Sequence, residues 1–349
     1  MIQKSLSEEA HKSILKKYGT GVFTDPRKVM ESPPMIVPMT PAIDISIYGG
    51  AQEGSWITLT GMPKMGKSTL ALKFAANCQK PEYGGRTIYY IDVEGRISKK
   101  NLDWAGFDFD KFHLIRSHKL PPTEEFPNGE PVIYYAEDYL GMGLDFLKND
   151  HGCVLIIDSI PMLTPRSTGE KSDFGEAGRR AEVNSLLSKF CQEVAQILPV
   201  NKNFVVAITQ MMGNPSGKGK TRTEKGGFAI AYQADTKLEA TYMEKISKKE
   251  GEAPIGQRVH WEVHCCSLGP PFQKPEMIIR YGEGVDTISE IIGCAKEYGV
   301  VELSGAWFKH KDAAGVEQKF QGEEKFRIYL KENPDETDII YGKLLSLFK

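Results

Sequence analysis

The chain has 349 residues, of which 40% are hydrophobic and 26% charged, a composition typical of a globular protein with a large core. Its formal net charge of −2 excludes a global basic field that would draw the whole surface to nucleic acid or membrane, so any nucleic-acid site must be local. The six cysteines lack metal-ligand spacing, no apolar run approaches the roughly 20 residues of a membrane span, and no signal peptide opens the chain, so we expect a cytoplasmic protein with no membrane partner.

The chain opens with a pattern that predicts a helix over residues 3–18, with Ile14, Leu15 and Tyr18 on one apolar stripe. Residues 24–41 contain five prolines and are expected to form an extended linker. Such a helix could dock either on its own core or on a neighbouring subunit. Residues 1–40 are therefore expected to form an N-terminal segment distinct from the core.

A phosphate-binding loop is predicted next. Residues 56–60 are apolar and rich in β-branched side chains, which indicates a buried strand, and residues 70–76 favour a helix. The intervening G-x-x-x-x-G-K-S spacing predicts that backbone amides and the helix N-terminus bind nucleotide phosphates. The alternative is a glycine-rich turn that binds nothing, but the strand before it and the helix after it favour nucleotide. The predicted nucleotide-binding residues are Gly61, Met62, Pro63, Lys64, Met65, Gly66, Lys67, Ser68 and Thr69.

The expected ligands are ATP and Mg²⁺. Lys67 is predicted to reach the β- and γ-phosphates, and Ser68 to ligate Mg²⁺. Residues 153–159 contain four apolar positions followed by Asp158, the pattern of a strand whose aspartate holds Mg²⁺ through water. The spacing of roughly 100 residues after the phosphate loop strengthens this interpretation.

Two further strands are predicted to end at the same edge. The strand over residues 87–94 ends in Asp92 and Glu94, and the strand over residues 204–209 is followed by Gln210. In open α/β sheets ligands bind beyond the carboxyl ends of the strands, where a carboxylate can orient water for attack on a γ-phosphate. The alternative is a pair of solvated strand-end acids. Strands that alternate with helices predict a parallel sheet covered on both faces.

Two basic loops follow these strands. Residues 164–180 carry Arg179 and Arg180, and residues 211–227 carry four cations against the single acid Glu224. A basic loop with few apolar residues suits the backbone of a polyanion, whereas a charge run alone is more often a solvated surface.

The C-terminal third is expected to hold two alternating antiparallel strands, over residues 237–243 and 257–263. From residue 286 a smaller unit follows, with helices predicted over residues 288–298, 323–333 and 338–347. The fold class is therefore α/β, with an N-terminal segment (1–40), a core (41–285) and a small α/β C-terminal domain (286–349).

In this order the motifs resemble those of the RecA family of bacterial recombinases. The resemblance covers nearly the whole chain and includes IDISIYGGAQEGSWITLTG, IDVEG, LIIDSIPMLTP, ITQ with a later GG, PPFQKPEMIIRYGEG, and the C-terminal GAWFKH with FRIYLKENP. The C-terminal run is the least generic of these, and the divergence is compatible with a virus-encoded member. The resemblance implies a RecA-like phosphate-loop ATPase core with a mostly parallel sheet flanked by helices.

The resemblance also implies residue roles. Glu94 falls at the family's water-activating glutamate, Asp158 at its magnesium aspartate, and Gln210 at the glutamine that senses the γ-phosphate, so Glu94, Lys67 and Gln210 are the predicted catalytic residues. Residues 164–180 and 211–227 match the first and second DNA loops. The implied DNA-binding residues are Arg179, Arg180, Met211, Met212, Lys218, Lys220, Arg222, Lys225, Gly226 and Gly227.

Two departures from the family pattern concern the nucleotide site. Two lysines that reach across to the neighbouring subunit's ATP are replaced by Cys265 and Ser267, which puts the hydrolysis rate in question. The family's adenine-stacking tyrosine falls near Asn101, which puts the base preference in question.

The implied function is that of an ATP-dependent DNA recombinase for recombination and repair. It would polymerise as a helical filament on single-stranded DNA, promote homologous pairing and strand exchange with duplex DNA, and hydrolyse ATP to ADP and phosphate. The N-terminal helix would grip the next subunit, and the C-terminal domain would help to capture duplex. Two alternatives are an ATP-gated DNA-coating scaffold with little hydrolysis, which the missing lysines would suit, and a ring helicase built on a related core.

Overall fold

The computed structural model describes the chain except residues 1, 24, 170–175, 214–221, 226–229, 231, 248, 250, 313 and 349. It divides into two compact units, residues 1–35 and residues 36–349. The first unit contains α1 (Ile2–Tyr18), a 3₁₀ turn (Thr20–Val22) and α2 (Pro26–Glu31). The first helix is confirmed. The predicted linker is not wholly extended, because Asp25 caps α2 by accepting a hydrogen bond from the Arg27 amide at 3.0 Å.

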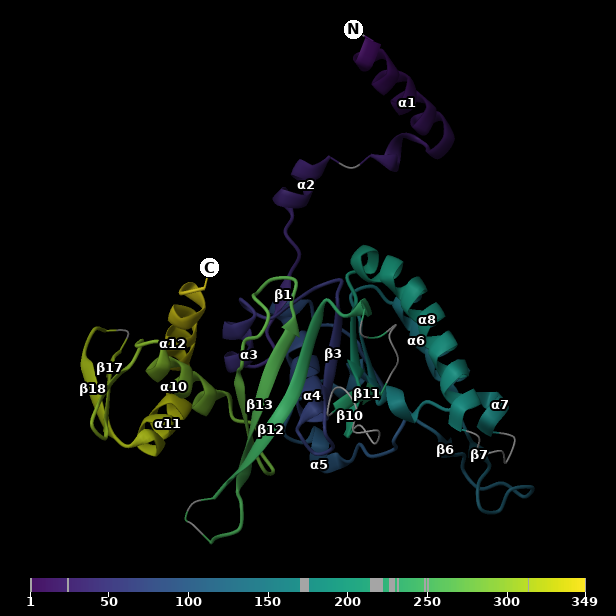
Figure 1. Cartoon of the computed structure of the whole chain (residues 1–349). Coiled ribbons are helices and arrows are strands. Elements are labelled where there is room, and N and C mark those ends of the chain that lie inside the picture. The colour runs from purple at the N-terminus through teal and green to yellow at the C-terminus, as the bar shows by residue number, and fades with distance from the viewer. Residues whose placement is uncertain are drawn as a thin grey trace. The chain divides into compact units, whose positions relative to one another are not determined.

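The second unit is built on a large mixed sheet (Figure 1). Within the described residues its strand order is β15-β14-β13-β12-β3-β9-β8-β4-β5. The strands from β12 through β5 run parallel to their neighbours, and β13, β14 and β15 add an antiparallel extension. The bounds are β3 (Trp56–Gly61), β4 (Ile88–Asp92), β5 (Phe112–Ile115), β8 (Val154–Asp158), β9 (Phe204–Ile208), β12 (Thr236–Ile246), β13 (Gly256–Cys265), β14 (Glu276–Arg280) and β15 (Gly284–Val285).

Helices cover both faces of this sheet, as predicted. On one face, α6 (Ala136–Asn149) and α8 (Glu176–Asn201) pack on side chains of β3, β8 and β9 that include Trp56 and Leu155. On the other face, Phe74 of α4 (Lys67–Cys78) meets Phe204 edge to face, with ring centroids 5.1 Å apart. Since its two faces are both buried, β9 is apolar throughout rather than alternating.

Short elements connect this framework. The helices are α3 (Pro41–Ser46), α5 (Lys99–Leu102) and α7 (Arg166–Gly169), with 3₁₀ turns at Pro81–Tyr83, Phe109–Lys111 and Ile160–Met162. Two-stranded ribbons pair β1 (Ile36–Val37) with β2 (Ala51–Gln52), β6 (His118–Lys119) with β7 (Pro131–Val132), and β10 (Gln210–Gly213) with β11 (Arg222–Lys225).

The C-terminal part has its own apolar core. It consists of α10 (Thr287–Glu297), β16 (Glu302–Ser304), β17 (Trp307–Lys311), β18 (Glu317–Gln321), α11 (Glu323–Glu332) and α12 (Pro334–Ser346). Buried Phe326, Leu330 and Ile340 form the centre of this core, to which α3 contributes Ile45. The last helix begins at Pro334, earlier than predicted, since proline is accommodated in the first turn of a helix. In the part of the chain that is described, no helix is long and apolar enough to span a membrane.

Candidate active site

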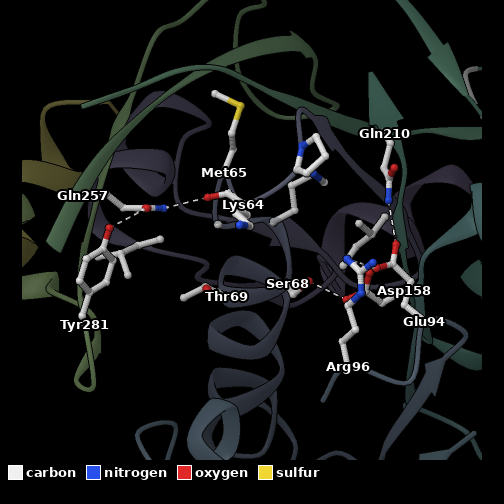
Figure 2. A pocket seen from close by; sticks show the side chains of 15 residues that line it. Lys64, Met65, Ser68, Thr69, Glu94, Arg96, Asp158, Gln210, Gln257 and Tyr281 are labelled. Carbon is white, nitrogen blue, oxygen red and sulfur yellow. Dashed lines mark hydrogen bonds and ion pairs between the residues drawn. The ribbon is translucent and has the colours of Figure 1, made fainter. Parts of the chain in front are cut away.

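The predicted phosphate loop runs from the end of β3 into α4 (Figure 2). Gly61 has φ 144°, and a Cβ there would lie 2.8 Å from the Ala240 carbonyl oxygen, so the close approach of β12 requires glycine. Gly66 caps α4 with φ 74°, which turns the loop so that the helix N-terminus faces the cavity. Strand, loop and helix are thus placed as a phosphate site requires.

Lys67 is buried at the base of this loop and is 7% exposed. Its Nζ donates hydrogen bonds to the carbonyl oxygens of Gly61 at 3.0 Å and Met62 at 2.8 Å. Burial lowers the pKa of Lys67, and the charges of Asp158 and Glu94 oppose this shift. The ammonium is therefore held in the loop, where phosphate oxygens could take the place of its carbonyl acceptors.

Ser68 and Asp158 lie together, although they are far apart in sequence. The Ser68 hydroxyl donates to Asp158 Oδ2 at 2.5 Å, and the hydroxyl of Tyr90 donates to the same oxygen at 2.6 Å. Burial raises the pKa of Asp158, and these two hydrogen bonds oppose the rise. A hydroxyl and a carboxylate are hard oxygen donors that fit Mg²⁺. Within the described residues, no cluster of three or more His, Cys, Asp or Glu could hold a metal, so Mg²⁺ would need phosphate and water oxygens as well.

The two acids after β4 have different surroundings. Asp92 is 2% exposed, and its carboxylate accepts the backbone amides of Arg96 and Ile97 at 3.1 and 3.0 Å. Glu94 Oε1 accepts hydrogen bonds from the Ser159 hydroxyl at 2.9 Å and the Gln210 amide at 2.8 Å. The alternative of two solvated acids is therefore wrong, because Asp92 holds the turn while Glu94 faces the site.

Glu94 also has an exposed partner. Its Oε2 forms an ion pair with Arg96 at 2.7 Å, in which the Arg96 side chain is 77% exposed and that of Glu94 only 9%. The carboxylate is therefore oriented mainly by the buried Ser159 and by Gln210, which begins β10.

These side chains surround a cavity of about 330 Å³ (Figure 2). Gly61 and Met62 do not line it but present their carbonyls to Lys67. The lining residues are Pro63, Lys64, Met65, Gly66, Lys67, Ser68, Thr69, Glu94, Arg96, Asp158, Ile208, Gln210, Gln257, Ile279 and Tyr281.

Sequence reasoning missed the wall formed by β13 and the end of β14. Gln257 donates from Nε2 to the Lys64 carbonyl oxygen at 3.2 Å, and the Tyr281 hydroxyl donates to Gln257 Oε1 at 3.3 Å (Figure 2). This contact supports Lys64, whose φ is 65°. A single polar residue on an alternating strand gives no signal in the sequence, whereas Tyr281 belongs to the YGEG run already singled out.

The predicted second DNA loop begins as a ribbon. Gln210 pairs with Lys225, Met211 with Glu224, and Gly213 with Arg222 across β10 and β11. The ribbon therefore starts from the residue that is hydrogen-bonded to Glu94. Lys218, Lys220, Gly226 and Gly227 lie outside the described residues, as do the side chains of Met212, Arg222 and Lys225.

In the first predicted DNA loop, Arg179 and Arg180 lie near the start of α8, and their side chains are likewise outside the described part. Arg166 is held by α6. Its guanidinium bonds both oxygens of Asp138 at 2.6 and 2.7 Å and lies 4.8 Å from the centre of the Tyr135 ring. This part of the loop is therefore attached to the core.

The chain departs from the family pattern at residues without a positively charged side chain, namely Cys265, Ser267 and Asn101. Cys265 ends β13 directly opposite Lys237 of β12, and its Sγ lies 3.5 Å from the Ala234 carbonyl oxygen. Burial raises the pKa of this thiol, and Ser267 is exposed. Asn101 accepts from the Ser98 amide and hydroxyl at 3.0 and 2.7 Å in a capping box, so it holds the start of α5.

Comparison with known proteins agrees with this arrangement. The model of the RecA N-terminal domain matches residues 5–286, and that of the RecA C-terminal domain matches residues 289–349. Protein RecA of Campylobacter hominis is 28% identical over 346 residues, covering 98% of this chain and 92% of that protein. Protein RecA of Bifidobacterium longum is 29% identical over 355 residues, covering 99% and 81%, and that of Francisella tularensis subsp. novicida is 30% identical over 315 residues, covering 88% and 78%. The chain belongs to the RecA family of ATP-dependent DNA recombinases, which are DNA-dependent ATPases that form filaments and act in recombination and repair.

Proposed function

We propose that this cavity binds ATP with Mg²⁺ and that Glu94 activates the water that attacks the γ-phosphate. The observation that carries the proposal is the convergence of Lys67, the Ser68–Asp158 pair and the Glu94–Gln210 pair on one cavity. In this arrangement the loop amides and Lys67 bind the phosphates, and Ser68 and Asp158 hold the metal. When bound, Mg²⁺ would neutralise charge that develops on the β- and γ-phosphate oxygens.

Glu94 is the side chain best placed to accept a proton from the attacking water. Its carboxylate belongs to the cavity wall and is oriented by Ser159 and Gln210. Asp92 is less suitable, because both of its oxygens accept backbone amides of the following turn. Attack of the water on the γ-phosphorus and cleavage of its bond to the β–γ bridging oxygen then give ADP and phosphate.

Gln210 is proposed to connect hydrolysis with DNA. Its side chain bonds Glu94, while its backbone begins the ribbon whose far end enters the predicted second DNA loop. A γ-phosphate that attracts the Gln210 amide would weaken the bond to Glu94 and shift the base of the ribbon. The DNA contacts are proposed to come from Arg179, Arg180, Met211, Met212, Lys218, Lys220, Arg222, Lys225, Gly226 and Gly227.

We further propose a division of roles along the chain. Residues 1–40 would grip the neighbouring subunit, residues 41–285 would bind nucleotide and single-stranded DNA, and residues 286–349 would help to capture a homologous duplex. Because each subunit has few phosphate contacts and the net charge is −2, affinity for DNA would come from repetition along the filament.

The test combines ATPase rates, measured with and without single-stranded DNA, with negative-stain images of the protein with ATP and DNA. We expect DNA-stimulated hydrolysis and helical filaments. Closed rings would support the alternative of a ring helicase, and filaments without hydrolysis would support the alternative of a DNA-coating scaffold. Lys67→Ala should abolish ATP-dependent filaments, because the charge on the terminal phosphates is lost. Lys64→Ala, in the same loop, is the charge-matched control and should keep them, because residue 64 is a variable position of the motif. Unaltered ATP binding by Lys67→Ala would refute the site.

A further inference from the structure

Tyr90 lies directly beneath the Ser68–Asp158 pair. It belongs to β4, which pairs with β8 so that Tyr90 is opposite Ile156 and Asp92 is opposite Asp158. The side chain is fully buried, and its ring stacks against Phe112 with centroids 6.1 Å apart. From this position its hydroxyl reaches diagonally to Asp158 Oδ2 at 2.6 Å. A rigid, buried donor thus contacts the carboxylate from below.

The two donors to Asp158 share one oxygen. Ser68 donates to Oδ2 from the phosphate-loop side and Tyr90 donates to it from inside the sheet. Rotation of the carboxylate would break both bonds, so together they fix its plane and the direction of Oδ1. Ser68 must also offer a lone pair to the metal, whereas Tyr90 is buried and has no such second task. The hydroxyl of Tyr90 is therefore the donor that can hold Asp158 throughout metal binding.

We propose that Tyr90 is a positioning residue for the magnesium site, acting by holding Asp158 Oδ2. The proposal rests on the function proposed above and deepens it. Partners that orient metal-binding groups typically change metal affinity by about 10- to 100-fold when they are removed. Tyr90 itself does not line the cavity, so its contribution comes through Asp158.

A purely structural role makes a different prediction. A buried hydroxyl needs an acceptor, and Asp158 could serve only that need. In that case removal of the hydroxyl would alter the stability of the fold but leave the Mg²⁺ requirement unchanged. The next residue on the same strand provides a matched comparison, because the Tyr89 hydroxyl donates to Asp150 Oδ2 at 3.0 Å and its ring stacks on Phe146 with centroids 4.0 Å apart. That pair does not line the cavity.

The experiment titrates Mg²⁺ against full-length protein with a fluorescent ATP analogue. The wild type is compared with Tyr90→Phe and Tyr89→Phe, each of which loses one hydroxyl and keeps the ring. We expect the Mg²⁺ midpoint of Tyr90→Phe to rise about 10- to 100-fold and that of Tyr89→Phe to stay at the wild-type value. Binding of the analogue in EDTA, which reports a folded phosphate loop, should be equal in all three proteins. A wild-type midpoint in Tyr90→Phe, or an equal rise in Tyr89→Phe, overturns the inference.

A double-mutant cycle tests whether Tyr90 acts through Asp158. In an Asp158→Ala background the side chain that Tyr90 holds is gone, so Tyr90→Phe should add no further shift to the Mg²⁺ midpoint. Fully additive shifts would show that Tyr90 acts by another route and would overturn the inference. A wild-type protein with no response to Mg²⁺ would instead overturn the proposed metal site, and this inference with it.

Discussion

Glu94→Gln is the sharpest test of the proposed chemistry, because it removes the base while the hydrogen-bond partners of residue 94 can stay in place. The amide keeps one acceptor oxygen for the Ser159 hydroxyl and the Gln210 amide, which lie 2.9 and 2.8 Å from Glu94 Oε1. It loses the ion pair with Arg96, whose side chain is 77% exposed. An ion pair with an exposed partner contributes at most about 1 kcal/mol. Folding, nucleotide binding and DNA binding should therefore persist.

The rate of hydrolysis should fall strongly, although the stability of the fold changes little. Loss of a general base typically slows a reaction about 10²- to 10⁴-fold, which corresponds to about 3–5 kcal/mol in the activation barrier. The assay is steady-state ATPase at saturating single-stranded DNA, with filament images as the measure of assembly. We expect filaments that are formed normally and turn over slowly.

Two neighbouring variants serve as controls. Arg96→Ala removes the exposed partner of Glu94 and should change the rate little. Asp92→Asn disturbs a carboxylate that accepts the Arg96 and Ile97 amides, so its main effect should be on stability. Normal turnover in Glu94→Gln would refute the assignment, and a rate loss that is specific to Asp92→Asn would move the base to that residue.

Three further predictions concern other parts of the chain. Replacing Lys218, Lys220 and Arg222 by Ala should weaken single-stranded DNA binding on all sequences alike and lower the slope of log K against log salt by roughly 0.7 per lost contact; an unchanged slope would place the DNA elsewhere. The double variant Cys265→Lys, Ser267→Lys should raise the DNA-dependent ATPase rate above that of the wild type, because the present side chains carry no positive charge that could stabilise a neighbour's γ-phosphate. Unchanged turnover with normal filaments would show that another cation already stabilises this phosphate, such as Lys237 opposite Cys265. Burial raises the pKa of Glu290 to about 7 from an ordinary value of 4.5, against hydrogen bonds from the Ile278 and Ala42 amides, so the folded state holds an extra proton between these values. The free energy of unfolding should therefore fall as pH rises through this window. Urea titrations at several pH values should show that Glu290→Gln loses the part of this pH dependence that Glu290 contributes.

The site was predictable where its signal is local and less so where it depends on pairing between distant strands. The phosphate loop, Asp158 and Glu94 could be proposed from the sequence because each follows a strand with a recognisable pattern, and the structure brings them to one cavity. The different surroundings of Asp92 and Glu94 arise from the turn after β4, which no spacing rule describes. Gln257 reaches Lys64 only because β13 joins the sheet beside β12. Tyr90 stands in an apolar run, so its pattern indicates core packing and gives no sign of its bond to Asp158.

Element types were likewise more predictable than their limits. The strand expected over residues 87–94 ends at Asp92, because the Asp92 carboxylate caps the following turn and Glu94 leaves the ladder. The strands expected over residues 237–243 and 257–263 are longer, since they pair with each other along nearly their whole length. In both cases the limit is set by a hydrogen-bond partner rather than by the residue's own propensity.

The bond between Glu94 and Gln210 offers a physical reason why hydrolysis in the proposed mechanism would depend on DNA. While the Gln210 amide donates to Glu94 Oε1, that oxygen has one fewer lone pair for a water proton. DNA that orders the ribbon of β10 and β11 in another position would draw Gln210 away and release the base. Because binding free energies are linked, a γ-phosphate that draws Gln210 away must favour DNA binding by the same factor as DNA favours the γ-phosphate. One hydrogen bond at the base of the predicted second DNA loop could thus couple the two ligands without direct contact between them.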